Sequence, residues 1–259
     1  MHRNIIILSI LGLYYALSLY ALYTFDAGLL ASSVVLFGIP SLILARFTLA
    51  PPAVIISVAL FGAGIAILFE GIAHIYGLWY TLGVDQVRLL GLIPVEMLFA
   101  TTIQIIFLAL LYEVFFDDGF YTVRSAWQRM VFFVVFAIII FGLLTIHHFL
   151  FDGLFLPYAY YWIIGSVLAA ALTVLALHRS LTIQFFDKVI DFSLIASIPL
   201  GIMLWISVTN VHKVFALTNE YAYMFPFFGQ MVPLEEVLLL FALPFFVGTI
   251  YEVYLDDRE

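Results

Sequence analysis

Two short motifs place carboxylates directly after a proline. Glu96 is the second residue after Pro94, and Glu235 and Glu236 are the second and third residues after Pro233. Paired carboxylates can act as proton donor and proton acceptor when their surroundings keep one protonated and the other ionised. Glu235 and Glu236 are therefore the first candidates for a catalytic acid and base, and Glu96 is their counterpart.

A purely structural role also explains these motifs. Proline is favoured at the first position of a helix, and carboxylates suit the first turn, where free amides and the helix dipole attract anions. The residues that follow each motif are apolar, however, and an ionisable side chain at the start of a membrane helix is costly enough to indicate function. The sequence leaves both interpretations open.

The other polar candidates are scattered. Glu70 and His74 lie one helical turn apart on the same face, and His212 follows in the second half of the chain. A lone Glu/His pair is more typical of interfacial hydrogen bonding than of a metal site. The chain has no cysteine, which excludes disulfides and thiolate catalysis, and we expect neither a metal nor a cofactor. Lys188 and Lys213 fall at helix ends, whereas a retinal-binding photoreceptor would carry a lysine midway along a late helix.

Membrane helices must position these residues. Hydrophobic residues make up 66% of the 259-residue chain and charged residues 10%, and the mean hydropathy is +1.19. Ordinary soluble domains have roughly 45–50% apolar and about 25% charged residues. Apolar stretches of about 20 residues are long enough to cross a hydrocarbon core of about 30 Å. The sequence predicts an all-α polytopic bundle with spans at about 4–24, 27–46, 51–71, 93–115, 128–149, 155–177, 187–207 and 233–254.

The distribution of basic residues predicts the orientation. If the chain crosses the membrane at every predicted span, only Arg88 and Lys213 fall on one side. The other side receives Arg3, Arg46, Arg124, Arg129, Arg179, Lys188 and Arg258. Because basic residues accumulate on the cytoplasmic side, we expect a multi-pass protein of the cell membrane with both termini in the cytoplasm. Such scattered basic residues predict no nucleic-acid partner.

The sequence also contains an internal repeat. The Pro-x-Glu motifs begin at Pro94 and Pro233, and Tyr-Glu-Val-x-x-Asp-Asp motifs begin at Tyr112 and Tyr251, so both pairs are offset by 139 residues. We expect two four-helix units, 1–125 and 126–259. An even number of spans per unit makes them parallel repeats, which places the Pro-x-Glu motifs together on the outer side. We interpret the Tyr-Glu motifs as solvated interfacial caps, with a structural or partner contact as the alternative.

These motifs resemble those of the integral-membrane lycopene cyclases, a family whose small hydrophobic domains occur as two-subunit enzymes or as tandem fusions. The matching residues of the first unit are Glu70, Ala73, Gly77, Trp79, Tyr80, Pro94, Val95, Glu96, Leu98, Phe99, Tyr112 and Glu113. Those of the second unit are Pro233, Leu234, Glu235, Glu236, Tyr251 and Glu252. Where the family shows a second carboxylate after Pro-x-Glu, the first unit has Met97.

The resemblance implies a redox-neutral isomerisation of an acyclic carotenoid such as lycopene. A terminal double bond is protonated, a ring closes through a carbocation, and a proton is lost. The catalytic residues would be Glu235, Glu236 and Glu96, and the supporting residues would be Pro94, Pro233, Glu70, His74, His212 and Trp79.

Other functions and partners stay open from the sequence. Water could quench the carbocation, which would make the chain a carotenoid hydratase or another carotenoid-modifying enzyme. A non-enzymatic alternative is a small membrane transporter or lipid-binding scaffold. The expected partners are a hydrophobic polyene and membrane lipid, and a homo-oligomer or contact with other carotenoid enzymes is left open.

Overall fold

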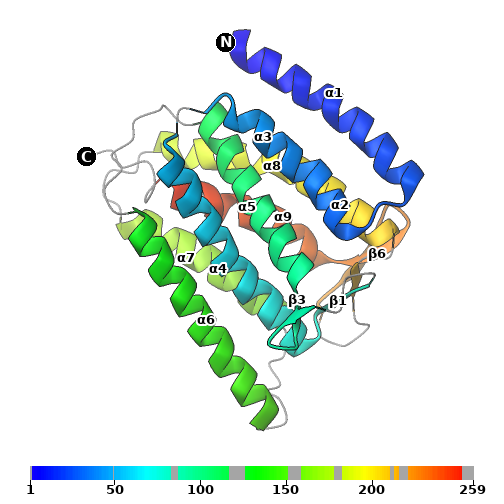
Figure 1. Cartoon of the computed structure of the whole chain (residues 1–259), viewed down its shortest axis with the longest axis vertical. Helices are drawn as coiled ribbons and strands as arrows, with labels where there is room; N and C mark the ends of the chain where they lie inside the picture. Colours follow the sequence, from blue (N-terminus) through cyan, green and yellow to red (C-terminus); the bar gives the residue numbers. More distant parts are fainter. Residues whose placement is uncertain are drawn as a thin grey trace.

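The structure is a computed structural model that describes residues 2–48, 50–82, 87–116, 126–150, 159–177, 183–210, 213–215 and 221–252. About 80% of the described residues are helical, and the helices lie side by side in one bundle (Figure 1). The helices are α1 (His2–Phe25), α2 (Leu29–Ser33), the π-helix η1 (Val34–Gly38), α3 (Ile39–Ala45), α4 (Pro52–Tyr76), α5 (Val95–Phe115), α6 (Ala126–Leu150), α7 (Ala159–Leu177), α8 (Ile183–Thr209) and α9 (Leu234–Ile250). Each predicted apolar stretch overlaps a helix, when α2, η1 and α3 are taken as one stretch.

Four helices of the described chain are long and apolar enough to cross a membrane. They are Arg3–Phe25, Pro52–Tyr76, Val95–Phe115 and Phe186–Thr209. The stretch Leu29–Ala45 and the apolar part of α7, Ala159–Thr173, are shorter, and α9 has 17 residues. These helices confirm a helical membrane protein, whereas eight crossings and cytoplasmic termini stay predictions.

Helices α5 and α9 form the centre of the bundle. Helix α5 packs against α4, α9 and the stretch from α2 to α3, whereas α9 packs against α7 and α8, and α6 covers α4 (Figure 1). Gly62 brings α4 close to α5, because a Cβ atom there would lie 3.1 Å from the Cβ atom of Ile105. Close packing of this kind holds the helices that position the site.

Helix α1 lies at the edge of the bundle, beside the stretch from α2 to α3 (Figure 1). Two of its tyrosines reach η1: the Tyr14 hydroxyl donates to the Val35 carbonyl at 2.6 Å, and the Tyr15 hydroxyl donates to the Leu36 carbonyl at 2.8 Å. A π-helical turn is irregular in its backbone hydrogen bonding. The tyrosine hydroxyls therefore bind carbonyl oxygens at the irregular turn and attach α1 to the bundle.

Three short two-stranded antiparallel sheets lie at one end of the bundle, where α4 ends and where α5 and α9 begin (Figure 1). The strands are β1 (Trp79–Thr81), β2 (Arg88–Leu89), β3 (Ile93–Pro94), β4 (Lys213–Phe215), β5 (Met224–Phe227) and β6 (Gln230–Pro233). Strand β1 pairs with β4, β2 with β3, and β5 with β6. In the pairing of β1 with β4, Thr81 lies opposite Lys213.

Glycine and proline set the transitions between helices and strands. Gly77 follows the last residue of helix α4, and its φ of 63° is left-handed. This conformation lets the Leu78 amide donate a hydrogen bond to the Ala73 carbonyl at 2.9 Å. Pro94 and Pro233 immediately precede α5 and α9. The predicted helix starts at the Pro-x-Glu motifs, at 93 and 233, are therefore confirmed to within two residues.

The Tyr-Glu motifs meet at the other end of α5 and α9. The Tyr112 hydroxyl donates to Glu252 at 2.7 Å, and the Tyr251 hydroxyl donates to Glu113. Tyr112 is 0% exposed and Tyr251 2%, so the interpretation of these tyrosines as solvated caps is wrong. They form a buried reciprocal contact between α5 and α9, whereas the aspartates of both motifs lie outside the described residues.

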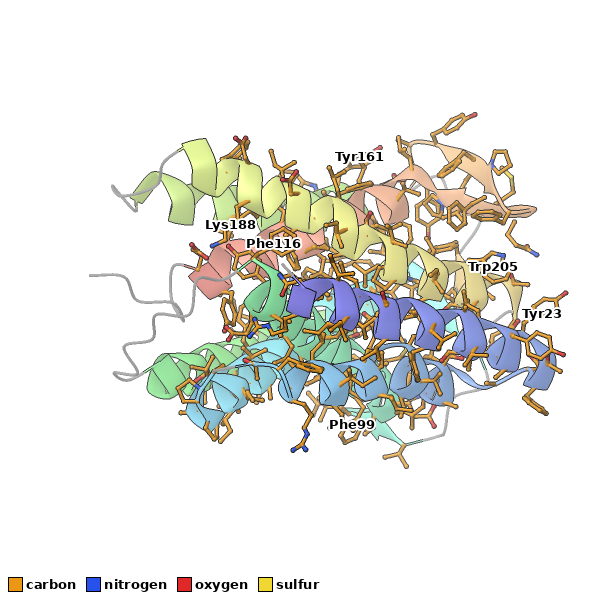
Figure 2. All side chains as sticks on the ribbon, turned by 90° about the horizontal axis from the view of Figure 1, so that it is seen from above. Tyr23, Phe99, Phe116, Tyr161, Lys188 and Trp205 are labelled. Carbon is orange, nitrogen blue, oxygen red and sulfur yellow. The ribbon has the colours of Figure 1, made fainter. Side chains whose placement is uncertain are left out.

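Both carboxylates of this contact have a second donor. The Thr48 hydroxyl donates to Glu113 at 2.8 Å, and the Lys188 Nζ atom lies 3.3 Å from an oxygen of Glu252. Figure 2 shows Lys188 and Phe116 at this end of the bundle, and Tyr23 and Trp205 at the end that carries the strands. The two ends of the bundle therefore carry separate groups of polar side chains.

Candidate functional site

A cavity of about 110 Å³ lies between α4, α5, α8 and α9, next to the paired strands β1 and β4. Most of its wall is apolar, and α8 and α9 provide Leu200, Met203, Leu204, Leu239, Leu240 and Leu243. Its ionisable groups are Glu70, Lys213 and Glu236, which come from α4, β4 and α9. The cavity therefore combines an apolar wall with acid–base groups from both halves of the chain.

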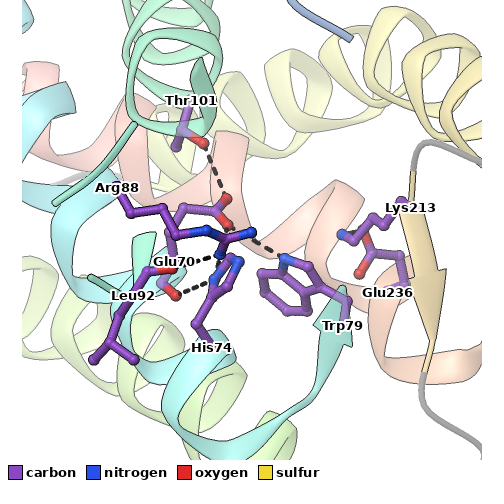
Figure 3. Close-up of polar contacts among 8 residues, drawn as sticks. All are labelled: Glu70, His74, Trp79, Arg88, Leu92, Thr101, Lys213 and Glu236. Atoms are coloured by element: carbon purple, nitrogen blue, oxygen red, sulfur yellow. Dashed lines mark hydrogen bonds and ion pairs between the residues drawn. The ribbon is translucent and has the colours of Figure 1, made fainter. Parts of the chain in front are cut away.

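Glu236 is fixed by the start of α9. It is the third residue of the helix and is 6% exposed. Its Oε1 atom lies 2.5 Å from the Lys213 Nζ atom, and its Oε2 atom accepts a hydrogen bond from the hydroxyl of Tyr160 on α7. Figure 3 shows the Lys213 and Glu236 side chains meeting between β4 and α9. Both carboxylate oxygens of Glu236 therefore have donors.

Glu70 has a different set of partners. It is 5% exposed, its Oε2 atom accepts from the Trp79 indole at 3.2 Å, and its Oε1 atom accepts from the Thr101 hydroxyl at 3.2 Å (Figure 3). The Nδ1 atom of His74 is hydrogen-bonded to the backbone carbonyl of Glu70 at 2.7 Å and lies 3.9 Å from Oε2. The hydrogen bonds to the Glu70 carboxylate thus come from neutral groups.

Trp79 lies between the two carboxylates. Its N–H group points to Glu70, and its ring centroid is 4.1 Å from the Lys213 Nζ atom. An ammonium over an indole ring is stabilised by about 0.5–2 kcal/mol, with the larger values at desolvated sites. Trp79 therefore contacts both the Lys213 ammonium, through its ring, and the Glu70 carboxylate, through its N–H group.

Lys213 reaches the cavity because β4 pairs with β1. The pairing fixes its backbone opposite Thr81, and its side chain is 15% exposed. Burial lowers the pKa of Lys213 to about 8, although the negative charge of Glu70 opposes this effect. Among the described lining residues, this one ammonium faces two carboxylates, so full ionisation leaves one negative charge in excess.

The structure brings together Glu236, Glu70 and Trp79 among the predicted residues, but it places Glu235 and Glu96 elsewhere. Glu235 is 0% exposed, and its Oε1 atom accepts from the Ala222 amide at 2.8 Å. Its Oε2 atom has no hydrogen-bond partner among the described residues. Neither Glu235 nor Glu96, which is half-buried, is part of the cavity lining.

The remaining predicted residues that the structure describes lie outside the cavity lining. Pro94 and Pro233 are buried at the ends of β3 and β6. His74 binds a backbone carbonyl, and His212 lies outside the described residues. Among the described residues, no group of three or more His, Cys, Asp or Glu side chains is arranged to hold a metal ion.

Sequence reasoning missed Lys213 and Tyr160 as parts of the site. The sequence puts Lys213 at a helix end, in a loop on the side of the membrane opposite the cytoplasm, and not in a cavity. Tyr160 is one of 15 tyrosines in the chain. A faint signal was available for Lys213, because it is a charged residue within an apolar segment. No comparable signal distinguished Tyr160 from the other tyrosines of the chain.

Comparison of the chain with models of known protein families, with curated protein sequences and with solved structures finds no significant match. The function proposed below therefore depends on the site and on the sequence motifs.

Proposed function

We propose that this protein is an integral-membrane enzyme that cyclises the end group of an acyclic carotenoid by acid–base catalysis, without net redox change. The observation that carries the proposal is the cavity in which Glu70 and Glu236 share an apolar enclosure. Cyclisation of a polyene needs a proton donor, a proton acceptor and an apolar site that admits a hydrocarbon. The resemblance of the motifs to membrane lycopene cyclases supports the same conclusion.

The different partners of the two carboxyl groups suggest their roles. We assign the ionised form to Glu236, because the Lys213 ammonium 2.5 Å away offsets the cost of burying its negative charge; an ionised Glu236 can accept a proton. Glu70 binds neutral donors, and the excess negative charge in an apolar cavity favours its protonated form. Glu70 is therefore the proposed proton donor, and Glu236 is the proposed base.

The proton balance of this mechanism closes. Glu70 transfers its proton to a terminal carbon–carbon double bond, and a neighbouring double bond attacks the resulting carbocation to form the ring. Glu236 removes a proton from the ring, which restores a double bond. Proton transfer from Glu236 back to Glu70 then returns the enzyme to its starting state, and no electron acceptor is needed.

Hydration of the carbocation is a second candidate outcome, because one part of the cavity lining is polar. The Thr81 hydroxyl is buried and has no hydrogen-bond partner among the described residues, and Gln104 and Ser207 also line the cavity. A water molecule held there could attack the carbocation and lose a proton to Glu236. The product would then be a tertiary alcohol instead of a ring.

The proposal includes eight membrane crossings in two parallel repeats, 1–125 and 126–259, with both termini in the cytoplasm. The reciprocal contacts of Tyr112 with Glu252 and of Tyr251 with Glu113 support two related halves. The equivalent starts of α5 and α9, each after a strand that ends in proline, also support them. The charge distribution supports the orientation.

Expression in a host that accumulates lycopene tests the proposal. Wild type should convert lycopene to a cyclised isomer of the same mass, whereas Glu70→Gln and Glu236→Gln should leave lycopene unchanged at equal protein levels. Asp191→Asn, which alters an exposed carboxylate on α8, is the matched control and should retain conversion.

The other outcomes identify the alternatives. A product heavier by one water would indicate hydration. Loss of conversion in Glu235→Gln, with conversion retained in Glu70→Gln, would return the acid–base pair to Glu235 and Glu236. Unchanged lycopene with correctly inserted wild-type protein would refute the enzyme, and uptake of a solute without new pigment would indicate a transporter.

A further inference from the structure

We propose that Lys213 is a covalent binding site for an apolar aldehyde, which it holds as a protonated imine inside the cavity. The inference goes beyond the proposed cyclisation and does not depend on it. It rests on the position of the amine, on the charges around it and on the composition of the wall.

The Lys213 amine lies inside an apolar enclosure. Strand β4 carries the residue, and its side chain points toward Glu236 and the Trp79 ring (Figure 3). The side chain is 15% exposed, although lysine usually keeps its ammonium in water. A ligand in the cavity therefore meets the amine directly.

The surroundings suit an iminium ion as well as they suit the ammonium. Glu236 at 2.5 Å supplies a counter-ion, and the Trp79 ring at 4.1 Å supplies a cation–π contact. Conversion of an ammonium into a protonated imine keeps one positive charge at the same nitrogen. The charge balance with Glu70 and Glu236 is thus unchanged when the covalent bond forms.

The amine is also available as a nucleophile. A lysine attacks carbonyl carbon only in its neutral form, and burial lowers the pKa of Lys213 to about 8. About a quarter of the side chains are then neutral at pH 7.5, against about 0.1% for an ordinary lysine with a pKa near 10.4. The neutral fraction of Lys213 therefore exceeds that of an ordinary lysine by more than a hundredfold.

Imine formation between the Lys213 amine and an aldehyde needs no further reactant and releases one water. The ammonium first transfers a proton to Glu236, and the neutral amine attacks the carbonyl carbon to give a carbinolamine after a proton passes from nitrogen to oxygen. Glu236 then protonates the hydroxyl group, water leaves, and the nitrogen lone pair completes the C=N bond. The products are the iminium ion, the Glu236 carboxylate and one water.

The wall selects the class of ligand. Leucine and methionine side chains of α8 and α9 form the apolar surface, which favours a hydrocarbon chain or ring. A carboxylate ligand would place a second negative charge beside Glu236, and an alcohol cannot form an imine. The class that fits is an apolar aldehyde with a terpenoid or polyene body.

The chain provides its own comparison, because Lys188 is its one other lysine. Lys188 is also paired with a carboxylate, at 3.3 Å from Glu252, and lies 5.5 Å from the ring centroid of Tyr112. It is not among the residues that line the cavity. An aldehyde that simply reacts with ion-paired lysines would label both positions.

The experiment uses the full chain in detergent micelles, with all-trans-retinal as the probe. After incubation at pH 7.5, borohydride reduction fixes any imine as a stable secondary amine, and peptide mass spectrometry locates it. The expected result is an adduct on Lys213 in at least tenfold excess over Lys188 and the N-terminal amine. Before reduction, a protonated imine should give a red-shifted absorption band that hydroxylamine removes.

Two variants provide controls. Lys188→Arg should retain the band and the adduct, whereas Lys213→Arg keeps the positive charge and should lose both. No adduct on wild type, equal labelling of Lys188, or a band that survives in Lys213→Arg would overturn the proposal. The mapping on wild type decides the question even if Lys213→Arg fails to fold, and conversion of lycopene reports separately on the cyclase.

Discussion

Replacement of Glu236 by glutamine should make the Lys213 amine reactive at lower pH. Glutamine keeps the shape of the side chain and an oxygen that can accept a hydrogen bond, but it removes the negative charge 2.5 Å from the Lys213 Nζ atom. Below the midpoint of the reaction the amine is protonated and inert, and above it the amine is neutral. Loss of the carboxylate makes deprotonation easier, so the midpoint should move down.

The size of the shift follows from the energy of the ion pair. At 2.5 Å and an effective dielectric constant of about 20, two unit charges attract by about 7 kcal/mol. The loss on breaking a buried pair is smaller than this Coulomb attraction, typically about 3–5 kcal/mol. The glutamine amide oxygen retains about 1 kcal/mol of that as a hydrogen bond. The remaining loss of about 2–4 kcal/mol corresponds to about two pH units at 1.36 kcal/mol per unit.

Reductive methylation measures the midpoint directly. In a Lys188→Arg background Lys213 is the one remaining lysine, and the extent of its methylation is followed by peptide mass spectrometry from pH 5 to 9. The parent should show a midpoint at about 8, and Glu236→Gln should show one about two pH units lower. Glu235→Gln changes the neighbouring carboxylate, which binds the Ala222 amide, and should leave the midpoint in place.

An unchanged midpoint in Glu236→Gln would show that the two side chains are not paired in the protein. A midpoint that rises would refute the electrostatic reasoning altogether. A shift of equal size in Glu235→Gln would mean that the carboxylate next to Lys213 had been assigned to the wrong residue.

Two further predictions concern the stability of the bundle, measured as thermal unfolding in detergent. Tyr251→Phe should destabilise by about 1.5–3 kcal/mol, the usual value of a hydrogen bond to a charged group. Tyr112→Phe should cost less, because its acceptor Glu252 keeps a charged donor, the Lys188 ammonium, whereas Glu113 keeps the neutral Thr48 hydroxyl. Gly248→Ala should destabilise by about 1–3 kcal/mol, since a Cβ atom there would lie 3.0 Å from a phenylalanine ring on α8. Gly142→Ala has nothing within 4 Å and lies in the interior of α6, so it should be neutral or slightly stabilising.

The helices could be predicted from the sequence because a bilayer imposes long uninterrupted apolar stretches. The six strands could not. Each has two to four residues, which is too short for an alternating pattern to emerge. The pairing of β1 with β4 joins segments that are distant in the chain, and no local pattern encodes it. Since that pairing positions Lys213, the missing strands and the missing lysine have the same cause.

The carboxylates were predictable as a group but not individually. A charge among apolar residues stands out in any sequence, which is why Glu70, Glu235 and Glu236 were all identified. Adjacent residues on a helix point about 100° apart, so only one of Glu235 and Glu236 can face a given cavity. The choice depends on how α9 is rotated against α7 and α8, and packing decides it.

The first Pro-x-Glu motif has Met97 where the second has Glu236, and the structure places both residues at the cavity. The two positions are offset by 139 residues. The second carboxylate of that cavity is Glu70, whose counterpart at an offset of 138 residues is the apolar Val208.

Each proposed repeat therefore contributes one carboxylate, but from a different helix. Two carboxylates at equivalent positions would have similar surroundings, and only their mutual repulsion would separate their protonation states. Glu70 and Glu236 are inequivalent, because the Lys213 ammonium is paired with Glu236 while Glu70 binds the Trp79 and Thr101 donors. In the proposed mechanism, the departure from a symmetric motif thus assigns the proton donor to one residue and the base to the other.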